Sequence, residues 1–137
     1  PAVIARSEAP HFPTKSVLVV EDNEVNQMLM KVILQKLSID PVLAKNGLEA
    51  FQQVTSQRFD LILMDINMPV MDGYEAMKKI RAYEAENHLS PVPIIALTAN
   101  VLQGDKARYL ASGADAILAK PLQLDALYQQ LNRLFKT

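Results

Sequence analysis

The 137-residue chain carries 14 Lys and Arg against 15 Asp and Glu, and half of its residues are hydrophobic. These values predict one domain with a full hydrophobic core. The formal net charge of −1 argues against a nucleic acid or a membrane surface as the main partner, because both attract basic patches. The absence of cysteine excludes a disulfide framework and any thiolate site.

Residues 1–15 hold three of the eight prolines and show no hydrophobic period. We interpret them as a linker from an upstream domain. The chain starts at Pro1 rather than Met, so we expect it to be part of a longer protein. No apolar run approaches the roughly 18 residues of a membrane span, and no signal peptide is recognisable. These features predict a cytoplasmic domain that makes no membrane contact itself.

Apolar runs and helical segments alternate along the rest of the chain. The apolar runs, each predicted to be a strand, are residues 17–20, 42–44, 61–64, 94–97 and 116–119. Helical spacing covers residues 24–37, 48–56, 74–81, 104–112 and 124–135, and the polar stretch 82–93 is predicted to be a loop. Strict alternation favours an α/β fold, an open parallel sheet with helices on both faces. A barrel needs eight such units, for which the chain is too short.

The third apolar run, Leu61 to Met64, ends at Asp65 and is followed by a turn containing Pro69 and Gly73. An unbroken run of this kind is typical of a strand buried on both faces. Asp65 would then lie at the carboxyl end of the strand, where open α/β sheets bind ligands. An aspartate after a strand also commonly caps the next turn, so this stretch alone leaves both roles open.

Four of the five runs end on polar residues, which are Glu21 with Asp22, Asp65, Thr98 and Lys120. In a parallel sheet these ends share one edge, so the side chains should converge. Three close carboxylates repel unless a cation lies between them, and oxygen ligands without His or Cys suit Mg²⁺. Lys120 can bind an anionic oxygen and Thr98 offers a hydroxyl. Together these groups indicate a phosphoryl-transfer site with an aspartate nucleophile.

Four motifs appear in a fixed order, and over residues 16–136 they resemble the receiver domain of two-component response regulators. The motifs are Val-Glu-Asp-Asn at 20–23, Met-Asp-Ile-Asn-Met-Pro-Val-Met-Asp-Gly at 64–73, Leu-Thr-Ala at 97–99 and Lys-Pro at 120–121. The resemblance implies a flavodoxin-like, doubly wound, five-stranded parallel sheet of order 2-1-3-4-5, the order known for chemotaxis members of this family. It also assigns residues 16–137 to the receiver domain.

The resemblance implies a role for each acidic residue of the site. Asp65 would be the phospho-acceptor. Mg²⁺ would be held by Asp22, Asp65 and the backbone carbonyl of Asn67, with Glu21 acting largely through water.

The resemblance also assigns Lys120 and Thr98. Lys120 would neutralise the phosphoryl group, Thr98 would move to bond it, and the Lys120–Pro121 bond would be cis. Members of the family often have Tyr or Phe three residues before the lysine, and this chain has Ile117 there.

The sequence Glu-Asp-Asn-Glu-Val-Asn-Gln at 21–27 looks most like receivers fused within hybrid sensor histidine kinases. Such receivers pass phosphate between histidines on kinase and phosphotransfer domains. The resemblance therefore implies a histidine kinase core or a histidine phosphotransfer protein as partner, and no nucleic acid. The domain itself would be a phospho-acceptor with at most self-dephosphorylation activity. The full-length protein would be a histidine kinase, and it could be anchored in the inner membrane.

Of three alternatives to this interpretation, one is close and two are disfavoured by particular residues. A stand-alone single-domain response regulator fits the same motifs. A haloacid-type aspartate-nucleophile phosphatase requires a second Asp where this chain has Asn67. A flavodoxin-like nucleotide binder requires a glycine- or hydroxyl-rich loop where this chain has Glu21 and Asp22, which would repel a phosphate in the absence of metal.

The first predicted helix has more apolar residues than one face of a sheet can cover. Its apolar positions sweep about 240° of the helix, whereas a helix on a sheet buries a stripe of somewhat more than 100°. Exposed apolar surface commonly marks a partner site. We therefore predict that Val25, Asn26, Leu29 and Ile33 bind the phosphate donor, the alternative being that the apolar residues are all core.

Overall fold

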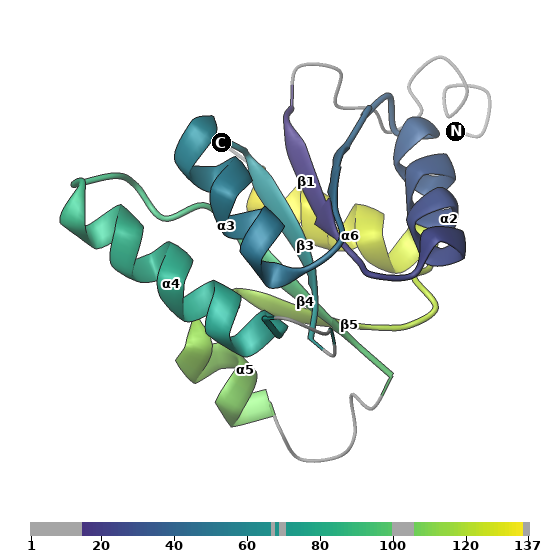
Figure 1. Ribbon diagram of the computed structural model, residues 1–137. Coiled ribbons are helices and arrows are strands. Elements are labelled where there is room, and N and C mark those ends of the chain that lie inside the picture. The colour runs from purple at the N-terminus through teal and green to yellow at the C-terminus, as the bar shows by residue number, and fades with distance from the viewer. Residues whose placement is uncertain (1–14, 67, 69–70, 100–105, 136–137) are drawn as a thin grey trace.

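The computed structural model describes residues 15–66, 68, 71–99 and 106–135, which form alternating strands and helices (Figure 1). In chain order these elements are β1 Val17–Val20, α2 Glu24–Gln35, β2 Val42–Ala44, α3 Gly47–Ser56, β3 Leu61–Asp65, α4 Gly73–Glu86, β4 Ile94–Thr98, α5 Lys106–Ser112, β5 Ala116–Ala119 and α6 Leu124–Leu134. Within this described part no helix is both long enough and apolar enough to cross a membrane.

The strands form one parallel sheet in the order β2-β1-β3-β4-β5, which confirms the predicted doubly wound topology. The register pairs Val20 with Met64 and Asp65 with Leu97. The carboxyl ends of the central strands are therefore level, and the residues that follow them share one edge of the sheet.

Two hydrophobic cores lie on opposite faces of the sheet because strand side chains alternate in direction. Leu18 and Val20 of β1 join the core covered by α3, α4 and α5, whereas Val17 and Val19 join the core covered by α2 and α6 (Figure 1). Every residue of β1, β3 and β4 is buried. This complete burial explains why these strands are unbroken apolar runs rather than alternating ones.

Polar caps fix where several helices begin, close to the carboxyl edge of the sheet. Asn23, Asn46 and Asp72 each accept a hydrogen bond from the backbone amide three residues further on, at 2.8 to 3.0 Å. Gly73 then allows α4 to start directly against β3, since a Cβ there would lie 2.5 Å from the carbonyl oxygen of Asp65. The caps and the glycine hold the ends of β1 and β3 in place.

The prediction that a loop begins at residue 82 is wrong, because α4 continues to Glu86. The ring of Tyr83 packs edge-to-face on Phe51 of α3, with centroids 6.0 Å apart. The buried Glu84 carboxylate accepts a hydrogen bond of 2.7 Å from the amide of Val92. These tertiary contacts stabilise a turn of helix whose sequence is polar.

The other helix boundaries agree with the predicted ones within one or two residues where the structure describes them, a usual uncertainty for helix ends. The first helix ends at Gln35 rather than residue 37, although Leu37 is still buried. The predicted start of a helix at Gly104, and almost all of the linker predicted over residues 1–15, lie outside the described residues.

Candidate functional site

The strand ends bring the predicted chemical groups to one edge of the sheet. Glu21 follows β1, Asp65 ends β3, Thr98 ends β4 and Lys120 follows β5. The backbone amide of Lys120 donates to the carbonyl of Thr98 at 2.9 Å, so β5 stays paired with β4 up to the site. The Lys120–Pro121 peptide bond is cis, as the resemblance implied.

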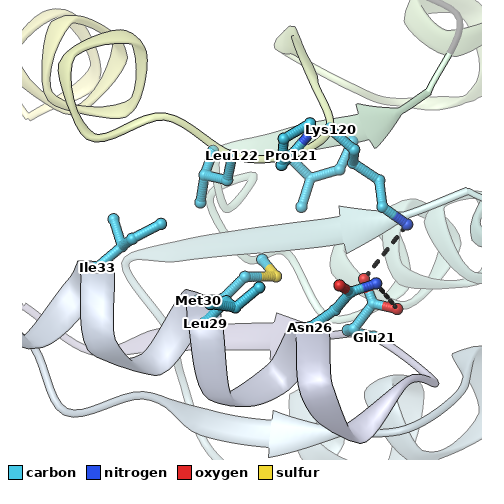
Figure 2. Close-up of a pocket in the computed structure, with 9 residues that line it drawn as sticks. Glu21, Asn26, Leu29, Met30, Ile33, Lys120, Pro121 and Leu122 are labelled. Carbon is cyan, nitrogen blue, oxygen red and sulfur yellow. Dashed lines mark hydrogen bonds and ion pairs between the residues drawn. The ribbon is translucent and has the colours of Figure 1, made fainter.

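The Lys120 side chain forms ion pairs with two buried carboxylates. Its Nζ lies 3.2 Å from Asp65 Oδ2 and 3.4 Å from Glu21 Oε1, and Figure 2 shows the lysine reaching toward Glu21. Both carboxylates are almost fully buried, whereas the lysine is partly exposed. One cation therefore bridges two anions at the floor of the site.

A third carboxylate joins these two on the solvent side. Glu21, Asp22 and Asp65, which we call the acidic cluster, can each offer one carboxylate oxygen such that all three oxygens lie within 4.8 Å of one another. Asp22 is exposed. Asn67, the fourth expected metal ligand, lies outside the described residues.

The electrostatics of the acidic cluster indicate a shortage of positive charge. Burial and the neighbouring charge of Asp65 raise the pKa of Glu21 above its ordinary value, against the opposing effects of the Asn23 amide and of Lys120. Burial also lowers the pKa of Lys120, but the charges of Asp65 and Glu21 outweigh this effect and raise it overall. The buried Glu21 carboxylate therefore favours a proton, and by the same physics it would favour a further cation.

One buried oxygen of the cluster points to the same conclusion. Glu21 Oε2 accepts hydrogen bonds from the Asn23 amide at 3.2 Å and from Asn26 Nδ2 at 3.4 Å. Glu21 Oε1 has no hydrogen-bond partner among the described residues, and its contact with Lys120 at 3.4 Å is at the long limit for such a bond. A buried carboxylate oxygen without a donor fits a hard divalent ion, so the acidic cluster could bind a metal.

Thr98 has a partner that the sequence did not reveal. The Tyr109 hydroxyl of α5 donates to Thr98 Oγ1 at 3.1 Å, and both residues are buried. The only sequence signal for this contact is a tyrosine on a helix that must face the sheet, because a buried phenol generally needs a hydrogen-bond partner. Ile117, at the position where an aromatic residue is common, is partly buried and packs against the same core.

Several large apolar residues of α2 are exposed, as expected from its excess of apolar positions. Val25 is 66% and Leu29 is 53% exposed, and Met28 and Val32, which the predicted partner site did not include, are exposed as well. Ile33 is partly buried.

A pocket separates α2 from the segment that follows β5. Asn26, Leu29 and Ile33 line it from the helix, and Lys120 and Leu122 line it from the opposite side (Figure 2). Three of the four predicted partner residues of α2, all except Val25, thus line a pocket that also includes the ion-paired lysine.

Known proteins with the same arrangement identify the family. Residues 17–132 match the family model described as the response regulator receiver domain. The chain is 44% identical over 119 residues to hybrid signal transduction histidine kinase G of Dictyostelium discoideum and 42% identical over 113 residues to sensor protein GacS of Pseudomonas syringae. These matches cover 85% and 82% of the chain but only 3% and 12% of the two relatives.

Solved structures agree with this assignment. The receiver domain of sensor histidine kinase PA1611 from Pseudomonas aeruginosa, with a magnesium ion coordinated in the active site cleft, has a TM-score of 0.80 and 42% identity over 90% of this chain and 98% of that one. A second match is a co-crystal structure of the Saccharomyces cerevisiae phosphotransfer protein Ypd1 and the receiver domain of Ssk1. Its TM-score is 0.84 and its sequence identity is 41%, with 90% of each chain covered. The chain is a member of the response regulator receiver domain family, and its function is phosphorelay signalling.

Proposed function

We propose that Asp65 accepts a phosphoryl group from a phosphohistidine. The observation that carries the proposal is the buried Asp65 carboxylate at the end of β3, held 3.2 Å from Lys120 within the acidic cluster. An Asp65 oxygen attacks phosphorus, the phosphorus–nitrogen bond of the donor breaks, and its electron pair returns to the imidazole. Lys120 binds the anionic oxygens that arrive, and the Thr98 hydroxyl donates to one of them.

We further propose that the metal of this site is Mg²⁺, held by Glu21, Asp22 and Asp65. Three observations support this proposal. The donor set contains only oxygen, Glu21 Oε1 has no hydrogen-bond partner among the described residues, and the related PA1611 receiver holds a magnesium ion in its active site cleft. When bound, Mg²⁺ supplies positive charge that lets phosphoryl oxygens approach the carboxylates. The protein's own contribution is to hold the nucleophile and lysine in position before the donor arrives.

The proposed donor is a histidine kinase core or a histidine phosphotransfer protein that docks on α2. Exposed apolar residues Val25 and Leu29, with Asn26 and Ile33 beside the pocket, support this surface. The co-crystal structure of Ypd1 with the related Ssk1 receiver supports a phosphotransfer protein as the kind of partner. We place the domain within a hybrid sensor histidine kinase because proteins of that kind are among its relatives. A separate response regulator is the second candidate, since mcs4 of Schizosaccharomyces pombe is 36% identical over 136 residues.

The acceptor assignment is tested by Asp65→Asn. We expect the variant to keep its thermal stability within a few degrees and to lose labelling by a phosphohistidine donor. The matched control is Asp125→Asn, which removes an exposed carboxylate on α6 and should be labelled normally. Undiminished labelling of the Asp65 variant at another residue would contradict the proposal.

The docking surface is tested by Leu29→Arg. A charge at a contact of this kind should slow transfer from the cognate donor about tenfold, while labelling by a small phosphodonor and stability stay within error. Leu110→Arg is a closely matched control, because Leu110 of α5 is 52% exposed and Leu29 is 53% exposed. Equal transfer rates for the two variants would place docking elsewhere.

A further inference from the structure

A buried hydrogen bond joins Thr98 to α5. The hydroxyl of Tyr109 donates to Thr98 Oγ1 at 3.1 Å, and the two residues are 4% and 2% exposed. This phenol takes no part in the reaction proposed above. Because Tyr109 is buried, the bond to Thr98 satisfies a hydroxyl that would otherwise be costly to bury.

Thr98 and Asp65 extend from opposite faces of the sheet. Ala96, two residues before Thr98, belongs to the core that contains Tyr109, whereas Leu63, two residues before Asp65, belongs to the core under α2 and α6. Since strand side chains alternate in direction, Thr98 starts on the Tyr109 face and Asp65 on the other. The threonine hydroxyl must therefore turn away from Tyr109 to come within hydrogen-bonding distance of a phosphoryl group on Asp65.

The ring of Tyr109 is held from its other side and cannot readily follow. It stacks on Tyr74 of α4 with centroids 5.4 Å apart and an interplanar angle of 9°. The guanidinium of Arg108 lies 3.6 Å from the centroid of the Tyr74 ring. This stack across α4 and α5 fixes the position of the phenol relative to the sheet.

We propose that Tyr109 is a positioning residue that holds the Thr98 hydroxyl away from Asp65 and so opposes the phosphorylated arrangement. When Thr98 turns to the phosphoryl group, the buried phenol of Tyr109 loses its hydrogen-bond acceptor. This loss destabilises the phosphorylated state. The inference rests on the proposed role of Asp65, and it gives Thr98 an aromatic partner in a chain that has Ile117 at the usual aromatic position.

The test is Tyr109→Phe, which keeps the ring and its stacking but removes the hydroxyl. We expect the dissociation constant for beryllium fluoride, a phosphoryl analogue, to fall about two- to tenfold in saturating Mg²⁺, the range given by one net hydrogen bond. Affinity for Mg²⁺ alone should not change. Tyr83→Phe, which removes the hydroxyl of a partly buried tyrosine on α4, is the matched control and should bind beryllium fluoride like the wild type.

Two further measurements separate a positioning role from general loosening of the core. On a Thr98→Val background, Tyr109→Phe should no longer tighten binding, because the bond is already absent. Three-bond scalar couplings to the Thr98 methyl group, measured without beryllium fluoride, should show a second side-chain rotamer in Tyr109→Phe and one rotamer in the wild type. A wild type that fails to bind beryllium fluoride contradicts the role of Asp65. If the wild type binds beryllium fluoride as tightly as Tyr109→Phe, or if the Thr98 couplings do not change, the role of Tyr109 is wrong while the role of Asp65 stands.

Discussion

The two edges of the sheet each carry a cluster of charged side chains, and the clusters differ in how completely their charges are satisfied. At the amino edge, Arg81 forms ion pairs with Glu84 at 2.8 Å and Asp115 at 3.1 Å, a set that we call the arginine cluster. At the carboxyl edge lies the acidic cluster with Lys120 at 3.2 and 3.4 Å. We call the arginine cluster closed, because its charges are satisfied within the protein, and the acidic cluster open, because its charges are not.

The arginine cluster is closed because each carboxylate also accepts a backbone donor. Glu84 binds the amide of Val92 at 2.7 Å, and Asp115 binds the amide of Ile94 at 2.9 Å. Two carboxylates thereby balance one guanidinium and tie α4 to the start of β4 and β5. A set of this kind needs no ligand, so we regard it as structural.

The charges of the acidic cluster are less completely satisfied, because Lys120 forms ion pairs with Glu21 and Asp65 and with no other carboxylate of the cluster. Glu21 keeps an oxygen without a hydrogen-bond partner among the described residues, and its pKa is raised by burial and by Asp65. The comparison teaches that buried charge by itself does not mark a functional site. Incomplete satisfaction of that charge does, since folding alone would favour pairing it.

The largest effect is expected when the closed cluster is broken. Glu84→Ala leaves the Val92 amide without an acceptor and removes one partner of Arg81, so we expect a loss of about 3 kcal/mol in the free energy of unfolding. Urea denaturation measures it. Glu86→Ala, at an exposed position two residues on, is the control and should change stability by less than about 0.5 kcal/mol. Equal losses of stability in the two variants would show that the arginine cluster does not stabilise the fold.

The same contrast explains what could be predicted from the sequence. The parallel sheet and the edge that carries Asp65 followed from apolar runs that stop at charged residues, whereas the strand order followed only from the resemblance to receiver domains. The burial of Glu84 could not be predicted, because a glutamate in a polar stretch looks solvated until the loop after α4 brings the amide of Val92 against its carboxylate. Tyr109 was missed because its contact with Thr98 joins a helix to a strand and depends on how α5 packs on the sheet.

The next effect in size concerns the addition of metal to the open cluster. Mg²⁺ at 100 times its dissociation constant should raise the free energy of unfolding by about 2.7 kcal/mol, because it binds only the folded state. Asp22→Ala should remove most of this gain, whereas Asp40→Ala, which truncates another exposed aspartate, should keep it. Melting curves with and without Mg²⁺ provide the measurement. A gain that survives in the Asp22 variant would place the metal outside the acidic cluster.

The smallest effect is a gain in stability, and we expect it when a negative charge is removed from the open cluster in the absence of metal. Glu21→Gln keeps an oxygen to accept from the Asn23 amide but removes the buried charge and its repulsion with Asp65. The raised pKa of Glu21 shows that these penalties exceed the attraction of Lys120. We therefore expect the variant to be more stable by about 1 kcal/mol at neutral pH in the absence of Mg²⁺, and to gain less from Mg²⁺ than the wild type.

The stability difference between Glu21→Gln and the wild type should depend on pH. Because the folded-state pKa of Glu21 is raised, its penalty is absent below the unfolded pKa, grows as the pH rises, and is complete above the folded pKa. The stability difference between Glu21→Gln and the wild type should therefore vanish on acidification. Glu86→Gln, which neutralises an exposed glutamate, is the matched control and should have the stability of the wild type at neutral pH without Mg²⁺. If Glu21→Gln is instead less stable than the wild type at neutral pH without Mg²⁺, then Lys120 already satisfies the buried carboxylate, and the carboxyl edge is as closed as the amino edge.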